Sequence, residues 1–413
     1  MKKLSSFTIL TVIFFIFLFS YDSFISIKYS YMGFLNNFSL FNFFISYSLL
    51  NLCFIYYIFI KDDFNRLICF FIIIFNSIPN SILYSYQLST ISIIIWSLLA
   101  IPITNIVLGF TSGIKLRKVK LTERSILFLL FFLMLLCLIP VILAHGIKFN
   151  FNVFLFKDIY DIRRESRLSN TTFSVYGYFW LAKVICPISI IYALEKKNKL
   201  LFIISSGVLL FLFMTTAHKS VFLTLFVILG FYIGANNYNE KYSQITKATL
   251  ILFLIILSLR VLINFEEPES LLIRRLFFIP SLLNYYFFDF FESSFTYYSN
   301  SYLSSFIDYP FDRTIPQLIG KAYFNSEEMS ANNGYISDGY ANFGQLGVFI
   351  NIFLASIVFK VLKSSNLPPK YFGLIFITIY AIQGSAFSTF LFTHAGILLL
   401  ILTPMLFNRK NEK

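Results

Sequence analysis

Charged residues are scarce in this sequence. Asp, Glu, Lys and Arg make up 13% of its 413 residues, against about a quarter in soluble domains. Hydrophobic residues make up 58%, with 55 Phe and 26 Tyr, and the mean hydropathy is +0.76. A soluble domain of this length exposes too much of its chain to water to hide so much apolar surface. The composition excludes soluble, disordered, collagen-like and coiled-coil classes, and it predicts an all-α polytopic integral membrane protein.

Histidine and cysteine are also rare. The three histidines, His145, His218 and His394, are far apart in the sequence and form no zinc or two-metal pattern. The four cysteines all lie inside apolar runs without CxxC spacing, so we interpret them as small buried hydrophobes rather than a disulfide framework. We therefore expect no metal site and no cofactor.

A cleavage site is missing from the first apolar run. Residues 4–20 follow Lys2 and Lys3 as in a signal peptide, but the run ends in FSYDS without a small-x-small pattern, so we expect an uncleaved span. The pattern predicts about twelve transmembrane helices in a single membrane domain, residues 1–413, and the shorter runs are either spans or re-entrant segments. The further runs lie near 40–60, 67–84, 88–110, 125–144, 174–194, 200–216, 220–236, 247–263, 339–359, 371–386 and 390–407.

The net charge of +13 would suggest nucleic acid in a soluble chain. Here most of the charges lie in short gaps between apolar runs, as the positive-inside rule describes, so we expect no nucleic-acid partner. With both termini in the cytoplasm, twenty Lys and Arg residues fall in inner segments, including the KLRKVKLTER stretch, and ten fall in outer ones. Nine of these ten lie in two long outer loops, about 145–173 and 264–338.

These two loops are too long to be simple connections. The stretch LFFIPSLLNYYFFDFF in the second is too apolar for disorder, and we expect it to form a helix at the membrane surface. Cations kept on the outer side favour an anionic ligand, such as a lipid-linked phosphate or diphosphate held by guanidinium groups. The alternative is that they pair with acids of the same loops, for example Arg163 with Asp161 or Arg274 with Glu267. The candidate ligands for the anion are Arg163, Arg164, Arg167, Arg274, Arg275 and Arg313.

Lys219 lies in the turn TTAHKS between two apolar runs, at or within the membrane edge. A cation inside the bilayer costs about 2.5–3.5 kcal/mol on insertion scales, so such residues usually have a partner or a ligand. The alternative is that Lys219 reaches the headgroups by snorkelling. His218 beside it is either a proton acceptor or a turn residue.

The segment SANNGYISDGYANFGQLGVF, residues 330–349, leads from the second loop into a late span. Asn332, Asn333 and Asp338 carry amide and carboxylate groups that suit sugar hydroxyls, and the glycines permit close backbone approach. Asp338 could be the general base for a hydroxyl nucleophile. Alternatively, it only caps a helix that begins at residue 339.

In this order, the RRESR loop, the TTAHKS turn, Arg274-Arg275 and NNGYISDGYANFGQLG resemble the Wzy-type O-antigen and oligosaccharide repeat-unit polymerases of bacterial inner membranes. The similarity covers the chain from about residue 125 onward. The turn has Lys219 where the family usually has Arg, and the distance from Arg167 to Gly177 is one residue short of an Arg-x10-Gly spacing.

The resemblance implies a glycosyltransferase of lipopolysaccharide or related polysaccharide biosynthesis. Its donor would be a glycan on undecaprenyl diphosphate, transferred to an incoming repeat unit at the outer face of the bacterial inner membrane, with membrane lipids and a chain-length regulator protein as partners. Preorganised cations would stabilise the leaving diphosphate, and Arg274 and Asp338 would be the catalytic residues.

Two other functions fit the topology. An O-antigen ligase also has a large outer loop with Arg, but it usually has a His there, and residues 264–338 contain none. A lipid-linked oligosaccharide flippase or another transporter would place charges along a central path and often shows two similar halves. The outer charges and unequal loops of this chain favour the polymerase.

Overall fold

The computed structural model describes residues 2–110, 121–155, 159–301 and 303–407. Helices are the only regular secondary structure in these ranges, and ten of them are long and apolar enough to cross a membrane, which confirms an all-α polytopic membrane protein. Two further apolar helices, Lys219–Tyr232 and Gly396–Phe407, are shorter. The basic stretch 115–120, Lys157 and the basic residues after 407 lie outside the described ranges.

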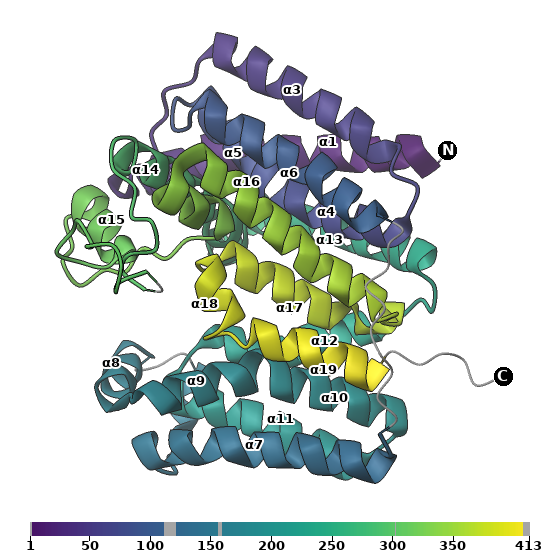
Figure 1. Cartoon of the computed structure of the whole chain (residues 1–413). Helices are drawn as coiled ribbons and strands as arrows, with labels where there is room; N and C mark the ends of the chain where they lie inside the picture. The colour runs from purple at the N-terminus through teal and green to yellow at the C-terminus, as the bar shows by residue number, and fades with distance from the viewer. Residues whose placement is uncertain (1, 111–120, 156–158, 302, 408–413) are drawn as a thin grey trace. The chain divides into compact units, whose positions relative to one another are not determined.

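The helices gather into two compact units, each built from separate parts of the chain (Figure 1). Unit 1 consists of Met1–Thr111, Tyr238–Phe359 and Ile382–Phe387, and unit 2 of Ser112–Asn237, Lys360–Ala381 and Ser388–Lys413. The apolar pattern of the sequence does not reveal this division, because the spans of both units are apolar runs.

Unit 1 is organised around its most buried span, Asp63–Ser85, of which 94% is buried. This span carries small polar residues that bond to its neighbours: Ser77 donates to the carbonyl of Ser97, and Ser46 and Ser85 share a hydrogen bond of 3.2 Å. The helices of unit 1 are α1 (Lys2–Ser20), η1 (Tyr21–Ile25), α2 (Ser26–Lys28), η2 (Ser30–Met32), α3 (Leu40–Ile58), α4 (Asp63–Ile72), η3 (Ile73–Ser77), α5 (Ile78–Ser85), α6 (Ile91–Gly109), α13 (Tyr238–Ile263), η6 (Glu269–Phe278), α14 (Ile279–Phe290), α15 (Ile315–Phe324) and α16 (Tyr335–Ser364).

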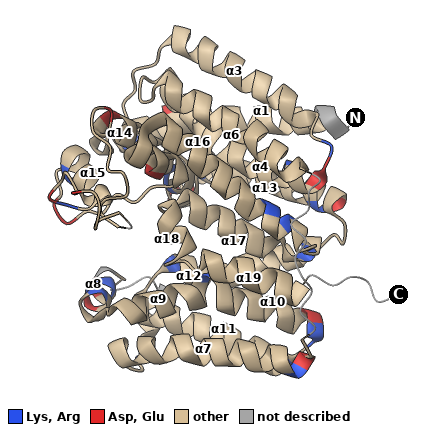
Figure 2. Ribbon diagram, in the orientation of Figure 1, with Lys and Arg blue, Asp and Glu red and all other residues tan. Residues whose placement is uncertain are grey.

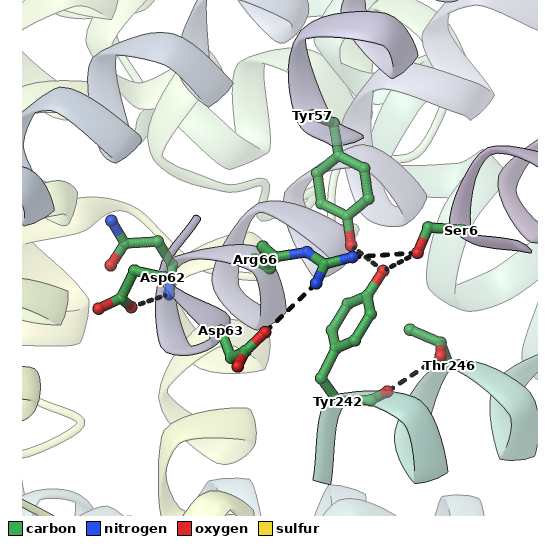
Figure 3. A network of polar contacts seen from close by, with 8 residues as sticks. Ser6, Tyr57, Asp62, Asp63, Arg66, Tyr242 and Thr246 are labelled. Atoms are coloured by element: carbon green, nitrogen blue, oxygen red, sulfur yellow. Dashed lines mark hydrogen bonds and ion pairs between the residues drawn. The ribbon is translucent and has the colours of Figure 1, made fainter. Parts of the chain in front are cut away.

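A polar network joins four helices at one end of unit 1 (Figure 3). The hydroxyl of Tyr57 donates to that of Tyr242, which donates to Ser6, both at 2.9 Å. The guanidinium of Arg66 lies 4.1 Å from the ring centre of Tyr242, donates to Ser6 at 3.1 Å and pairs with Asp63 at 3.2 Å. Both terminal nitrogens of Arg66 are bonded, to Asp63 and Ser6, whereas its buried Nε has no hydrogen-bond partner among the described residues.

The continuous helix Glu269–Phe290 contains the apolar stretch of the second loop. By length and composition it is also a candidate span. Both of its ends, however, meet the short connection between α1 and α3. Glu266, just before the helix, pairs with Lys28, and Tyr286 near its end donates to the carbonyl of Met32 at 3.4 Å. The helix therefore starts and finishes at the same end of unit 1.

Apart from Lys183, which lies inside the span Thr172–Lys196, the described helices of unit 2 carry most of their charges near the two ends (Figure 2). The pair between Lys196 and Glu123 lies at one end, and the basic helix α8 lies at the other. The helices are α7 (Glu123–His145), η4 (Phe151–Leu155), α8 (Ile159–Ser169), α9 (Thr172–Trp180), η5 (Leu181–Ile185), α10 (Cys186–Lys196), α11 (Lys199–Thr216), α12 (Lys219–Tyr232), η7 (Pro369–Tyr371), α17 (Phe372–Gln383), α18 (Phe387–Leu391) and α19 (Gly396–Phe407). The division between the units falls within α16, α17 and α18.

Candidate anion-binding site

The first outer loop is fastened to the turn between α11 and α12. Arg163 of α8 donates twice to the carbonyl oxygen of Ala217, from Nε at 3.2 Å and from Nη2 at 3.0 Å. Ala217 ends α11 with a left-handed backbone, φ +53°. This carbonyl cannot bond within its own helix, and the guanidinium of Arg163 satisfies it. Two segments that the sequence analysis selected separately, RRESR and TTAHKS, are thus in direct contact.

An apolar cluster below this contact holds α8 in place. Its buried members come from the loop and from the end of α11, and partly buried side chains of α8, α11 and α12 pack around them. The buried members are Val153, Ile159, Phe213, Met214 and Ala217, and the others are Ile162, Leu210 and Phe222. The loop is therefore packed on the helices rather than free in solvent.

His218 is the residue before α12 and lies among cations. Burial, followed by the nearby charges of Arg163, Arg167 and Lys183, lowers the pKa of His218 to about 4. The imidazole is neutral at physiological pH, and Lys219, the first residue of α12, follows it. The positive end of the α12 dipole adds to the field of these side chains.

Lys183 lies inside the span Thr172–Lys196, in the π-helical segment Leu181–Ile185. Its Nζ is 5.4 Å from the ring centre of Tyr380. Among the described residues, no carboxylate lies within 4 Å of this ammonium group. The charge also reaches His394, whose pKa is lowered to about 3 by burial and then by Lys183. π-helical turns and intramembrane cations both concentrate at functional sites.

We call Arg163, Arg167, Lys183 and Lys219, together with the neutral His218, the cation cluster. Three separate segments supply it: α8, the span that begins with α9, and the α11–α12 turn. Arg167 is exposed and, like Lys183, forms no ion pair with a described carboxylate. Arg164 on the same helix is exposed, and no contact within the described ranges brings it into the cluster.

The expectation that loop cations pair with loop acids holds for Arg313. Its guanidinium pairs with Glu327 at 3.2 Å and with Asp312 at 3.6 Å, so its charge is compensated locally. No ion pair between Arg163 and Asp161 is present among the described residues; Arg163 binds the backbone carbonyl of Ala217. The pairing of Arg274 with Glu267 is not observed either.

Arg274, in η6 of unit 1, is held by neutral groups. Its guanidinium lies 3.9 Å from the ring centre of Tyr29 and donates from Nη2 to Ser270 at 3.0 Å and from Nη1 to the sulfur of Met32 at 3.4 Å. Arg275 beside it is exposed. Within the described ranges neither arginine has an ion pair, whereas the nearby carboxylates of Glu266 and Glu269 pair with Lys28 and Arg260.

Asp338 does not cap a helix that begins at residue 339. Helix α16 begins at Tyr335, and Asp338 lies in its first turn, so the capping interpretation is wrong. The buried carboxylate accepts four hydrogen bonds. Oδ2 accepts from the hydroxyl of Tyr298 at 3.2 Å, the amide of Asn351 at 3.2 Å and the backbone N–H of Phe387 at 3.0 Å, and Oδ1 accepts from Asn342 at 3.1 Å. One carboxylate thus joins three regions of unit 1.

These contacts exist because α16 folds back on itself. Gly344 has φ +58° and ψ −141°, a conformation open to glycine, and it separates a short arm from a long one. A Cβ atom placed on Gly347 would lie 2.0 Å from the carbonyl oxygen of Gly339. In a straight helix these residues would be about 12 Å apart along the axis. The amide of Asn351 also donates to the carbonyl of Tyr335, which fastens the two arms together.

The two asparagines before this helix differ in access. Asn333 is buried and bonds to Asn284, to Ser337 and to the carbonyl of Pro280. Asn332 is exposed, with only a long contact of 3.4 Å to Ser330, and is free to meet a ligand. The structure thus places Asn333 in the framework of the fold-back and Asn332 on its surface.

Lys183 and His394 were not among the candidate site residues from the sequence. A signal for Lys183 was present, since it is a single cation inside an otherwise apolar run. His394 gave none, because only packing brings it near Lys183. Comparison with known proteins gives no match: no family model, no curated protein and no solved structure matches this chain.

Proposed function

We propose that this membrane protein is a polysaccharide polymerase that transfers a growing glycan from undecaprenyl diphosphate to the next lipid-linked repeat unit, at the outer face of the bacterial inner membrane. Both termini would then lie in the cytoplasm. The products would be O-antigen or a related surface polysaccharide, and a chain-length regulator would be the protein partner.

The observation that supports this proposal is the cation cluster. The leaving group of the reaction is a diphosphate, on which negative charge develops as the glycosidic bond breaks. Forked guanidinium groups bind phosphate oxygens in pairs, and Arg167 is exposed and has no described acid to compete for it. Lys219 and the N-terminus of α12 add positive charge at the same place.

Unit 1 contributes two further features to the proposal. Arg274 and Arg275 form a second cationic point that could hold a phosphorylated substrate. Asp338 supports the fold-back of α16 with all four of its hydrogen bonds, which favours a positioning role over direct proton transfer. The exposed carboxylates of the same loop, among them Glu328, are then candidates for the base that activates the acceptor hydroxyl.

The test is the polysaccharide made by a strain that lacks this protein. A polymerase mutant leaves the lipid A core with a single repeat unit, and the full ladder returns when the wild-type chain is supplied. The Arg167→Gln variant should restore only the single unit, whereas Lys199→Met, at the opposite end of unit 2, should restore the ladder.

Other outcomes would reject the proposal. A core without any repeat unit indicates a ligase. Lipid-linked intermediates that accumulate on the cytoplasmic side indicate a flippase. A ladder of normal length from Arg167→Gln would remove the cation cluster from the mechanism.

A further inference from the structure

We propose that Lys183 binds the lipid-proximal phosphate of a diphosphate whose hydrocarbon chain stays in the bilayer. The ligand would then reach unit 2 sideways from the membrane rather than from the aqueous side. This inference deepens the proposed function and rests on it for the identity of the lipid. The phosphate site itself rests on the geometry around Lys183.

Lys183 lies deep within its membrane span. It is eleven residues from the start of the span Thr172–Lys196 and thirteen from its end. At about 1.5 Å per residue, its Cα lies about 16 Å or more along the helix from either end. A flexible lysine side chain cannot place its ammonium group fully outside the membrane from there, so its charge has to be met inside unit 2.

Within the described part of the chain, no carboxylate pairs with the ammonium group of Lys183. Its ammonium group faces the ring of Tyr380, and it lies close enough to His218 and His394 to affect both. Neither histidine is protonated at neutral pH, and His394 itself packs 4.7 Å from the ring of Phe179. Aromatic and neutral imidazole groups attract a cation weakly, whereas a phosphate would compensate it fully.

The backbone around Lys183 departs from a regular α-helix. The span changes to π-helical hydrogen bonding at Leu181–Ile185, and Lys183 is the central residue of that segment. π-helical turns are rare in proteins and frequent at functional sites. The described chain has three others, Tyr21–Ile25, Ile73–Ser77 and Glu269–Phe278, so the turn supports a ligand site here only together with the charge that it carries inside the span.

Lys183 and the arginines of α8 lie near the same side chain. The charges of Arg163, Arg167 and Lys183 all lower the pKa of His218, and Arg163 also binds the carbonyl of Ala217, the residue before it. The inner lysine and the outer arginines are therefore all close to one imidazole. This arrangement suits a ligand with two linked phosphates, of which the inner one meets Lys183 and the outer one Arg167.

The chain contains a natural reporter for a binding experiment. Only two tryptophans occur in the sequence, Trp96 in α6 and Trp180, which is one turn before Lys183 and donates to the carbonyl of Phe392 at 2.9 Å. In a Trp96→Phe background, the fluorescence of Trp180 reports on this region alone. The full chain in nanodiscs would be titrated with undecaprenyl diphosphate, undecaprenyl monophosphate, inorganic pyrophosphate and phosphatidylglycerol.

We expect undecaprenyl diphosphate to bind at least tenfold more tightly than pyrophosphate or phosphatidylglycerol. Lys183→Met should weaken binding of both undecaprenyl phosphates by ten- to a hundredfold, Lys183→Arg should restore most of it, and the control Lys199→Met should change nothing. Because Lys183→Met removes an uncompensated cation, the variant without ligand should melt at the same or a higher temperature. A misfolded variant would therefore be recognised by its melting temperature and replaced by Lys183→Gln.

Three results would overturn the inference. The first is unchanged binding of undecaprenyl diphosphate to a folded Lys183→Met or Lys183→Gln protein. The second is pyrophosphate binding as tight as that of the lipid, which would indicate entry from water. The third is equal binding of phosphatidylglycerol, which would indicate an ordinary lipid headgroup site.

The inference and the proposed function can fail separately. If Lys183-dependent binding is found but the deletion strain makes a normal polysaccharide ladder, the site stands and the polymerase is rejected. If the deletion strain stops at a single repeat unit but Lys183→Met restores the full ladder and binds the lipid normally, the polymerase stands and the role of Lys183 is rejected.

Discussion

Arg163 and Ala217 are 54 residues apart in the sequence, and two N–H groups of the arginine share the one carbonyl oxygen of the alanine. This contact joins the first outer loop to the turn between two membrane helices. It requires the forked shape of guanidinium, because an ammonium group could direct only one N–H to the same oxygen from that distance.

Arg163→Gln should therefore release α8 from the turn, and Arg163→Lys should do so in part. Hydrogen exchange of Ile159–Ser169 should be faster in Arg163→Lys than in the parent, and fastest in Arg163→Gln. The local stability of this segment should fall by about 1–3 kcal/mol. Arg164→Gln on the same helix is the matched control, since Arg164 is exposed. Equal exchange in the Arg163 and Arg164 variants would show that the contact is unimportant.

Asp338→Asn should lower the stability of unit 1 even though it keeps the shape of the side chain. The carboxylate accepts four hydrogen bonds, and an amide in its place presents an NH2 group to at least one of those donors. We expect about 1–3 kcal/mol, measured by thermal unfolding of the purified protein.

The same substitution at Asp308, which is exposed and has no ion pair or side-chain hydrogen bond within the described ranges, should have little effect on unfolding. If Asp338→Asn melts like the parent but stops synthesis at a single repeat unit, Asp338 acts as the base and the positioning role is wrong.

Gly347→Ala should open the fold-back of α16. The added methyl group would lie 2.0 Å from a backbone oxygen, which cannot move aside as a flexible side chain would. Protein level and melting temperature should both fall. Gly207→Ala, where nothing lies within 4 Å of the new atom, should be neutral or stabilising by about 0.5–1 kcal/mol. A normal melting temperature for Gly347→Ala would contradict the close backbone contact.

Acid should destabilise the protein without ligand through His218. Its pKa is about 4 in the folded chain against 6.5 ordinarily, so the unfolded chain takes up the proton first as the pH falls. The neutral His218 therefore does not lower the free energy of unfolding above pH 6.5. As the pH falls from 6.5 toward 4, protonation of the unfolded chain lowers that free energy by about 3 kcal/mol at most. The charged groups that face it are Arg163, Arg167 and Lys183.

Melting temperatures at pH 7.5 and pH 5 should therefore differ less in His218→Asn than in the parent. His394 changes in the same direction and remains in both proteins, so the difference between them isolates His218. An identical pH dependence would show that His218 is already solvated.

The contacts of Glu269–Phe290 predict that this helix does not carry the chain across the membrane. A cysteine at Ser304 should then react with an impermeant maleimide from outside, and one at Lys197 should react only after the membrane is opened. The four native cysteines are buried and should give little background. Labelling of both positions from the same side would mean that the helix spans, and the predicted orientation would be wrong.

The membrane class, most spans and the helical nature of the second loop could be predicted because they depend on composition and run length. The fold-back of α16 could not be predicted. The chain reverses within Tyr335–Ser364 through the backbone angles of Phe343 and Gly344, and backbone angles cannot be read from the sequence. Two of the selected segments, RRESR and TTAHKS, are in contact through Arg163. Asn333 and Asp338 were selected because they could bind a ligand, but their side chains form hydrogen bonds within the protein. A residue type indicates what a group can bind, but packing decides whether a ligand can reach it.

The contact between Gly339 and Gly347 also has an evolutionary consequence. When two side chains clash, a smaller partner can restore the fit, but here each glycine meets the peptide backbone of the other. No substitution at one position can make room for a side chain at the other. The two glycines should therefore persist or disappear together among relatives of this protein, and the loss of one should accompany a differently built entry to the helix.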